Sequence, residues 1–348
     1  MKTIGIFLLL LLAQPAVAAT LLIEELPPLP QASSNNAVSA FRDNQGLHLI
    51  SLLGLGSQKT PTAIHKQGFI SSQGKWQKIS VPGQPRLASA AANIGNSIYL
   101  LGGYTVADDG SEVSTPEVYR YQDGKWQTLR PMPVPVDDMV VLVYQQRYIY
   151  LVSGWHDVGN VNLVQVLDTR TGEWQQATPW PGEPVFGHAG AIFEDRMVVC
   201  DGVRIQYPQL NLGTEKKREF LSSPQCWLGE INKDDIRRIN WQRLANHPGD
   251  ARYRMVAAAT DTGLLVFAGG STNPYNYDGV GYNNKASVAE AEVFSYDLKA
   301  DRWQVLGSLP QASMDHRGMI YDQGWFYLLG GMTNPQTVTD RVLRFKLD

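Results

Sequence analysis

One sequence phrase recurs at long intervals along this chain, and it restricts the possible folds more than any other feature. An apolar stretch ends in a pair of small residues, and a Trp follows after one further strand-like stretch. The copies are Ile98–Gly103 with Trp126, Ile149–Gly154 with Trp174, Met197–Gly202 with Trp241, Leu265–Gly270 with Trp303, and Phe326–Gly331. Repeats of this length are typical of solenoids, propellers and arrays, in which each unit packs against its neighbours.

Each repeat contains four strand-like stretches. The first is small and apolar, as at 88–92, and a tight turn such as Gly95-Asn96 leads into the stretch that ends in the Gly pair. A third stretch, such as 118–121, turns through Asp123-Gly124 into the Trp stretch, as a β-hairpin requires. Four short strands per repeat predict one propeller blade each, so we expect an all-β chain.

The blades can be counted, and they predict a six-bladed β-propeller that forms a single domain over residues 20–348. We expect the blades at 33–80, 81–130, 131–179, 180–245, 246–307 and from 308 onward. The last blade lacks a Trp stretch, whereas residues 21–30 resemble the ends of the other repeats at 126–133 and 303–310. Because open sheet edges invite aggregation, the N-terminal strand is predicted to complete the last blade and close the ring.

Residues 1–19 have the pattern of a secretory signal peptide. Lys2 precedes an unbroken apolar stretch at 4–12, and small residues at 16–19 form a cleavage site. No other stretch approaches the length of a membrane span. We therefore expect export to the periplasm or secretion.

The chain has two cysteines, Cys200 and Cys226. They fall in neighbouring predicted strands of one repeat, and an oxidising compartment favours a disulfide between them. The alternative is a reactive thiol, although no nearby residue marks either cysteine as a site of low pKa.

The Gly pairs, the spaced aromatic residues and the Trps resemble the kelch family of repeats. The resemblance covers essentially the whole mature chain and implies a kelch-type propeller. Kelch propellers include protein-binding modules, sugar-related enzymes and the copper enzyme galactose oxidase, so the resemblance alone does not identify the function. Galactose oxidase chemistry requires copper and a Cys-linked Tyr, whereas both cysteines here are expected to pair within one blade.

Residues that occur once per repeat are interpreted as structural, and function is expected where the repeats differ. Polar residues differ from blade to blade where the innermost strands begin and where the loops follow the Gly pairs, a pattern that suits a specific ligand site. The predicted ligand-binding residues are Arg86, Asp138, His156, His188, Arg204, Arg254, Tyr275, Tyr277, His316 and Arg317. The alternative is that the charged residues pair with one another and hold the blades in register.

Two loops after the Gly pairs are long, at 203–224 and 271–287. Loops of this length in a compact repeat fold are usually functional or disordered. Their aromatic, amide and charged residues suit recognition of a sugar.

Composition and motifs exclude several other functions. The net charge is -3 and the one basic cluster is Lys216-Lys217-Arg218, which makes nucleic acid a poor partner. Four histidines are expected on one face, namely His156, His188, His247 and His316, but none has the spacing of a metal-ligand motif. Known catalytic signatures and phosphate loops are absent, so we expect neither a metal nor a cofactor, and the catalytic residues are unknown.

Three functions are consistent with this sequence. The first is binding of a small polar ligand, of carbohydrate type, at the channel mouth. The second is sugar mutarotation, because the chain is similar to bacterial kelch proteins that interconvert sialic acid anomers. In that family a Glu and an Arg in a loop after a Gly pair are implicated, and here Glu215 and Arg218 lie only further along the loop. The third is a scaffold for protein–protein interaction, which the kelch resemblance supports.

Overall fold

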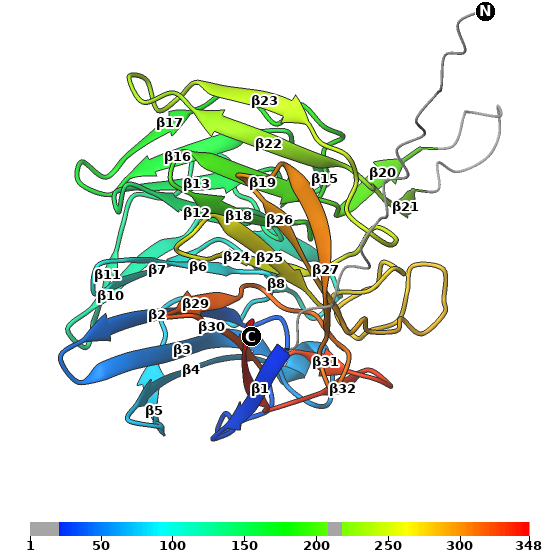
Figure 1. Cartoon of the computed structure of the whole chain (residues 1–348). Coiled ribbons are helices and arrows are strands. Elements are labelled where there is room, and N and C mark those ends of the chain that lie inside the picture. The colour runs from blue at the N-terminus through cyan, green and yellow to red at the C-terminus, as the bar shows by residue number, and fades with distance from the viewer. Residues whose placement is uncertain (1–20, 208–217, 348) are drawn as a thin grey trace, which may run out of the picture.

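The computed structural model describes residues 21–207 and 218–347, which form six four-stranded antiparallel sheets (Figure 1). The innermost strands of successive sheets contact one another in the order β2, β6, β12, β18, β24 and β29, and β29 contacts β2 again. The sheets are therefore the blades of a closed six-bladed β-propeller, as the repeats predict. Apolar side chains fill the space between neighbouring blades and form most of the core.

The strands run outward in sequence order in the first five blades. Blade 1 contains β2 (Ala37–Asp43), β3 (Gly46–Leu55), β4 (Ile64–Ser72) and β5 (Lys75–Ser80). Blade 2 contains β6 (Ala90–Ile94), β7 (Ser97–Leu101), β10 (Val118–Gln122) and β11 (Lys125–Thr128). Blade 3 contains β12 (Val140–Tyr144), β13 (Tyr148–Val152), β16 (Val164–Asp168) and β17 (Glu173–Gln176). Blade 4 contains β18 (Ala189–Phe193), β19 (Arg196–Cys200), β22 (Cys226–Ile231) and β23 (Ile239–Arg243). Blade 5 contains β24 (Val256–Ala259), β25 (Leu264–Ala268), β26 (Glu292–Asp297) and β27 (Arg302–Ser308).

Blade 6 combines the two ends of the described chain. It contains β29 (Ile320–Asp322), β30 (Trp325–Leu329), β33 (Val342–Leu347) and, outermost, β1 (Leu21–Leu26). β1 is antiparallel to β33, with Leu21 opposite Leu347 and Leu26 opposite Val342. The N-terminal strand therefore completes the last blade, as predicted. The expected signal peptide at 1–19 lies outside the described residues.

The first glycine of the Gly pair allows close contact between blades. Gly102 has a φ of +54°, and a Cβ there would lie 2.3 Å from the carbonyl oxygen of Val136 in the next blade. Gly330 has a φ of +69°, and its Cβ would lie 2.1 Å from the carbonyl oxygen of Ser33. A larger residue would be strained at both positions and would push the next blade away.

The repeated Trps also join neighbouring blades. Each indole N–H donates a hydrogen bond to a backbone carbonyl at the end of the preceding blade, which satisfies a polar group beside an apolar interface. The pairs are Trp76 with Pro27, Trp126 with Ser80, Trp174 with Arg130, Trp241 with Thr178 and Trp303 with Ala245. The structural interpretation of the Trps is confirmed.

Short additional strands follow the Gly pairs or, in the case of β28, precede the innermost strand of blade 6, and β20, β21, β31 and β32 project on one side of the molecule in Figure 1. They are β8 (Tyr104–Val106), β9 (Glu112–Ser114), β14 (Trp155–His156), β15 (Gly159–Asn160), β20 (Val203–Gln206), β21 (Glu219–Ser222), β28 (Ser313–Met314), β31 (Met332–Thr333) and β32 (Thr337–Val338). Blade 1 carries the 3-10 helix η1 (Pro61–Ala63) instead. Within the described residues, no helix is long and apolar enough to cross a membrane.

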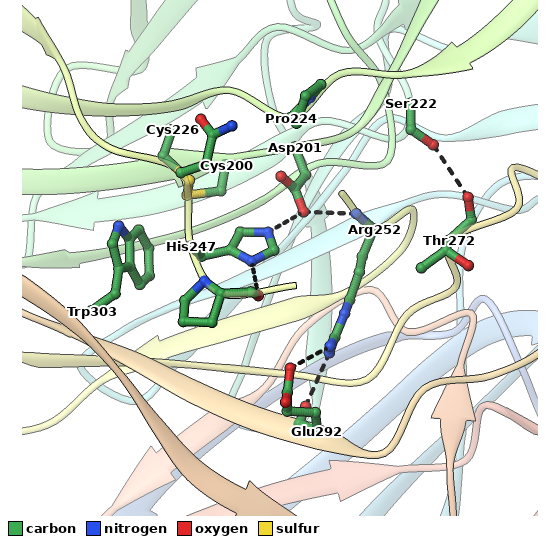
Figure 2. A network of polar contacts seen from close by, with 12 residues as sticks. Cys200, Asp201, Ser222, Pro224, Cys226, His247, Arg252, Thr272, Glu292 and Trp303 are labelled. Carbon is green, nitrogen blue, oxygen red and sulfur yellow. Dashed lines mark hydrogen bonds and ion pairs between the residues drawn. A yellow bond between two sulfur atoms is a disulfide. The ribbon is translucent and has the colours of Figure 1, made fainter. Parts of the chain in front are cut away.

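Cys200 and Cys226 form a disulfide, as predicted, between directly opposed residues of β19 and β22. It closes a loop with a sequence separation of 26, and in the chain-entropy model a loop of this size stabilises the fold by about 3 kcal/mol. Figure 2 shows the disulfide beside a polar network that reaches blade 5. In that network His247 Nε2 lies 2.7 Å from Asp201 Oδ2, and Arg252 Nη2 lies 2.9 Å from Glu292 Oε2.

Candidate ligand-binding cleft at the channel mouth

Six residues with left-handed backbone surround the mouth of the central channel, one before each innermost strand. Their φ values lie between +51° and +63°. They are Asn35, Ala88, Asp138, Gly187, Arg254 and Asp315. Backbone N–H groups link most of them into a ring, as in the bonds from Gly187 to Asp138 (2.8 Å) and from Arg254 to Gly187 (2.7 Å). The shared backbone conformation therefore places unlike side chains at equivalent positions.

Two arginines and two aspartates form a buried ion-pair cluster on this ring. Arg254 bonds to Asp315 through Nη1 (2.7 Å) and to Asp138 through Nη2 (2.8 Å), and Arg317 also pairs with Asp138. None of the four side chains is more than 6% exposed. Burial disfavours the charge on Asp138, but the two guanidinium groups outweigh burial and lower the pKa of this carboxyl. The cluster is neutral as a whole, and Arg254 separates the channel from the outer face.

A cleft of about 350 Å³ lies on the outer side of Arg254. It is off the propeller axis, because its walls come from the loops and hairpins of blades 2 to 5. The lining residues are Tyr104, Gly110, Glu112, Asp137, Asp138, Trp155, Asp157, Phe186, Arg218, Phe220, Arg254, Asn276 and Tyr282.

Aromatic rings form much of the wall of this cleft. The rings of Trp155 and Phe186 are 5.3 Å apart at their centroids, and the rings of Phe220 and Tyr282 stack at 4.0 Å. The guanidinium of Arg218 lies 5.8 Å from the centroid of Trp155. These rings offer flat apolar surfaces of the kind that pack on a sugar ring.

A pair of carboxylates, joined by Ser114, faces the same cleft. Asp157 donates its backbone N–H to Ser114 Oγ (3.1 Å), so the Ser114 hydroxyl donates its own proton to Asp137 Oδ2 (2.6 Å). Asp137 is only 2% exposed, and burial together with the charge of Asp138 raises its pKa well above the ordinary value. No hydrogen bond joins Asp137 Oδ1 to another described residue.

Comparison with known proteins finds the same motif and the same fold elsewhere. A family model described as the Kelch motif matches residues 85–133, which form blade 2. The solved structure of YjhT superposes with a TM-score of 0.69 and 18% identity over 91% of this chain and 96% of that one. The chain has the fold of a kelch-type β-propeller.

Curated relatives support this assignment. Human Kelch-like protein 15 is 21% identical over 280 residues, which cover 78% of this chain and 43% of that protein. Kelch domain-containing protein 3 of Bos taurus is 23% identical over 281 residues, which cover 74% of this chain and 66% of that protein. The kelch propeller thus spans less than half the length of the first of these relatives.

Two of the ten predicted ligand residues, Asp138 and Arg254, line the cleft of the kelch propeller. Tyr275 is fully buried behind Arg254, whose guanidinium lies 5.5 Å from its ring centroid. His188, His316 and Arg317 lie on the channel side instead. Much of the predicted set thus belongs to the buried mouth, because the charges pair with one another as the alternative interpretation stated.

Four other predicted residues make contacts of their own outside the cleft. Arg86 is buried and pairs with Glu117, and His156 Nδ1 lies 2.8 Å from the carbonyl of Pro135. Arg204 Nε lies 3.4 Å from Glu183. Tyr277 packs against the apolar cluster at the mouth, and Glu215 lies outside the described residues. Within 21–207 and 218–347, no three His, Cys, Asp or Glu side chains gather closely enough to hold a metal ion.

The predicted ligand-binding set omitted the other eleven lining residues, among them Glu112, Phe186, Phe220 and Tyr282. Glu112 and Phe220 lie on the returning strands β9 and β21, which fold back over the mouth after a turn. The alternation of side chains along the strands on both sides of each loop turn is the sequence signal that could have identified these two residues. Tyr282 lies in the loop at 271–287, and its stacking on Phe220 joins loops of the consecutive blades 4 and 5.

Proposed function

We propose that this propeller binds a small polar ligand of carbohydrate type in the cleft at the channel mouth. One arrangement carries the proposal, namely that aromatic walls at Trp155, Phe220 and Tyr282 face carboxylates at Asp137 and Asp157. Rings pack on the apolar face of a sugar, and carboxylate oxygens accept hydrogen bonds from its hydroxyl groups. These residues differ from blade to blade, as a specific site requires.

Saturation-transfer NMR with a panel of monosaccharides and short glycans tests the proposal. Trp155→Ala removes one wall of the cleft and should weaken binding of any responding sugar about tenfold, because a stacked ring contributes about 1 kcal/mol or more. Tyr207→Ala is the matched control, since Tyr207 is 53% exposed, follows β20 and does not line the cleft. Absence of saturable binding across the panel would contradict the proposal, as would equal effects of the two substitutions.

Sugar mutarotation is a second candidate, and Asp137 favours it. A buried carboxyl with a raised pKa retains its proton and can give it to the ring oxygen, while the Asp157 carboxylate removes the proton of the anomeric hydroxyl. The ring C–O bond then breaks as the carbonyl forms, and the reverse transfers close the ring on the other face. Exchange NMR between the two anomers measures this activity, and Asp137→Asn should abolish the enzyme-dependent exchange.

We further propose that the protein is exported. The pattern of residues 1–19 supports export, and the Cys200–Cys226 disulfide is compatible with an extracellular or periplasmic location. Mass spectrometry of the N-terminus after expression with the complete sequence tests cleavage of the expected signal peptide.

A further inference from the structure

Among residues 21–207 and 218–347, the charged groups that line the cleft do not balance. Asp138 and Arg254 belong to the neutral buried cluster, so they contribute no net charge to the cleft. The remaining charged groups among the described lining residues are three carboxylates, on Glu112, Asp137 and Asp157, and one guanidinium, on Arg218. Even with a proton on Asp137, this described part of the lining has two carboxylates against one guanidinium.

The carboxylates are placed to act on a ligand rather than on one another. Asp137 is only 2% exposed and lines the cleft. Its Oδ1 has no hydrogen-bond partner among the described residues. Glu112 and Asp157 are exposed, stand on the hairpins of blades 2 and 3, and line the same cleft as Asp137. A cation in the cleft would therefore meet negative charge both at the base and at the rim.

The aromatic wall of the cleft, formed by Trp155, Phe220 and Tyr282, also suits a cation. Aromatic faces attract positive charge through the ring quadrupole, and the attraction grows when water is excluded. Arg218 already lies over Trp155 at 5.8 Å, which shows that this wall accommodates a cationic group. An acidic ligand would instead meet the excess of carboxylates and be repelled.

From this combination of unbalanced carboxylates and aromatic wall we infer that the ligand carries a protonated amine, and that amine-bearing sugars are the preferred class. The inference rests on the proposed sugar-binding function and adds the charge of the ligand to it. The amine contacts the carboxylates of Glu112, Asp137 and Asp157, while the sugar ring packs on the aromatic wall.

Isothermal titration calorimetry with glucosamine, N-acetylglucosamine and glucose tests the inference at neutral pH, where most of the glucosamine carries a charged amine. Glucosamine should bind at least about tenfold more tightly than the two uncharged sugars, with a preference that decreases as salt increases. Glu112→Gln and Asp157→Asn keep the size of the side chains and should each reduce the preference about threefold or more. Asp108→Asn removes one charge from the same hairpin outside the lining and should leave the preference unchanged.

The outcomes separate the two proposals. Equal affinity for all three sugars overturns the amine inference and leaves sugar binding intact. A preference that survives both Glu112→Gln and Asp157→Asn also overturns it, because the carboxylates are then not its source. If none of the three sugars binds and the wider panel gives no response, the proposed function itself fails. Circular dichroism spectra of the two variants check that each retains the native fold.

Discussion

At the scale of single residues, Arg254 has the most demanding environment in the molecule. Its guanidinium is 3% exposed and bonds to both Asp138 and Asp315. Arg254→Met would leave two buried carboxylates with only Arg317 to balance them, so we expect a loss of about 3 to 5 kcal/mol in the free energy of unfolding. Urea denaturation measures the loss. The control is Arg42→Met, which breaks the exposed pair with Asp322 and should lower the free energy of unfolding by less than about 1 kcal/mol. Similar losses of stability in the two variants would contradict the expected role of burial.

The residues of the mouth also show what sequence could predict at this scale. The repeat register correctly placed Asp138, Arg254 and Arg317 near one another around the channel. It could not give the direction in which each side chain points, because a left-handed residue turns its side chain differently from a residue in a strand. Asp138, Arg254 and Arg317 therefore pair with one another and with Asp315, and the open cleft lies beside this cluster.

At the scale of elements, a hydrogen bond between His247 and Asp201 connects blades 4 and 5, and the two side chains share its proton. His247 Nδ1 lies 2.7 Å from the carbonyl of Pro248, which only accepts, so Nδ1 carries a hydrogen, and the Nε2 contact with Asp201 needs a second one (Figure 2). Burial disfavours the imidazolium, but the bond to Asp201 and its charge raise the pKa of His247 above 6.5. Burial also raises the pKa of Asp201. The folded protein therefore binds this proton more tightly than the unfolded chain.

The stability of this connection should consequently depend on pH. Above the ordinary His value of 6.5 the unfolded chain releases a proton that the folded chain keeps, so the free energy of unfolding falls as pH rises toward the folded pKa. The slope is at most about 1.4 kcal/mol per pH unit for one proton. Urea denaturation at several pH values above neutrality measures it. His247→Gln keeps a donor to Asp201 but does not titrate there, and should flatten the curve; an unchanged slope would show that other groups set the pH dependence.

Between elements, sequence reasoning succeeded where spacing alone fixes neighbours. Cys200 and Cys226 are opposed because β19 and β22 are adjacent strands of one blade, and that adjacency follows from the repeat. The stacking of Phe220 on Tyr282 could not be predicted in the same way. It joins loops of different blades whose paths depend on turns outside the repeat, so the aromatic wall of the cleft becomes visible only in three dimensions.

At the scale of the whole molecule, β1 converts six blades into a closed ring. It pairs with β33 along all six residues, and Leu21 and Ile23 pack against the apolar cluster between blades 5 and 6. Removal of residues 1–26 would expose the edge of β33 and its unpaired backbone groups, which are a template for pairing with another chain. We expect this truncation to lower the free energy of unfolding by about 3 kcal/mol or more, since several partly buried apolar side chains are lost.

The matched control for this truncation is removal of residues 1–20 alone, which keeps β1 and should leave the ring closed. Size-exclusion chromatography and urea denaturation compare the two proteins, and the shorter one should show both lower stability and concentration-dependent oligomers. A synthetic peptide of residues 21–26 added in excess should partly restore the monomer, because it occupies the vacant edge. If the two truncated proteins behave alike, blade 6 is stable as a three-stranded sheet, and the ring is held by contacts among the innermost strands rather than by its outermost strand.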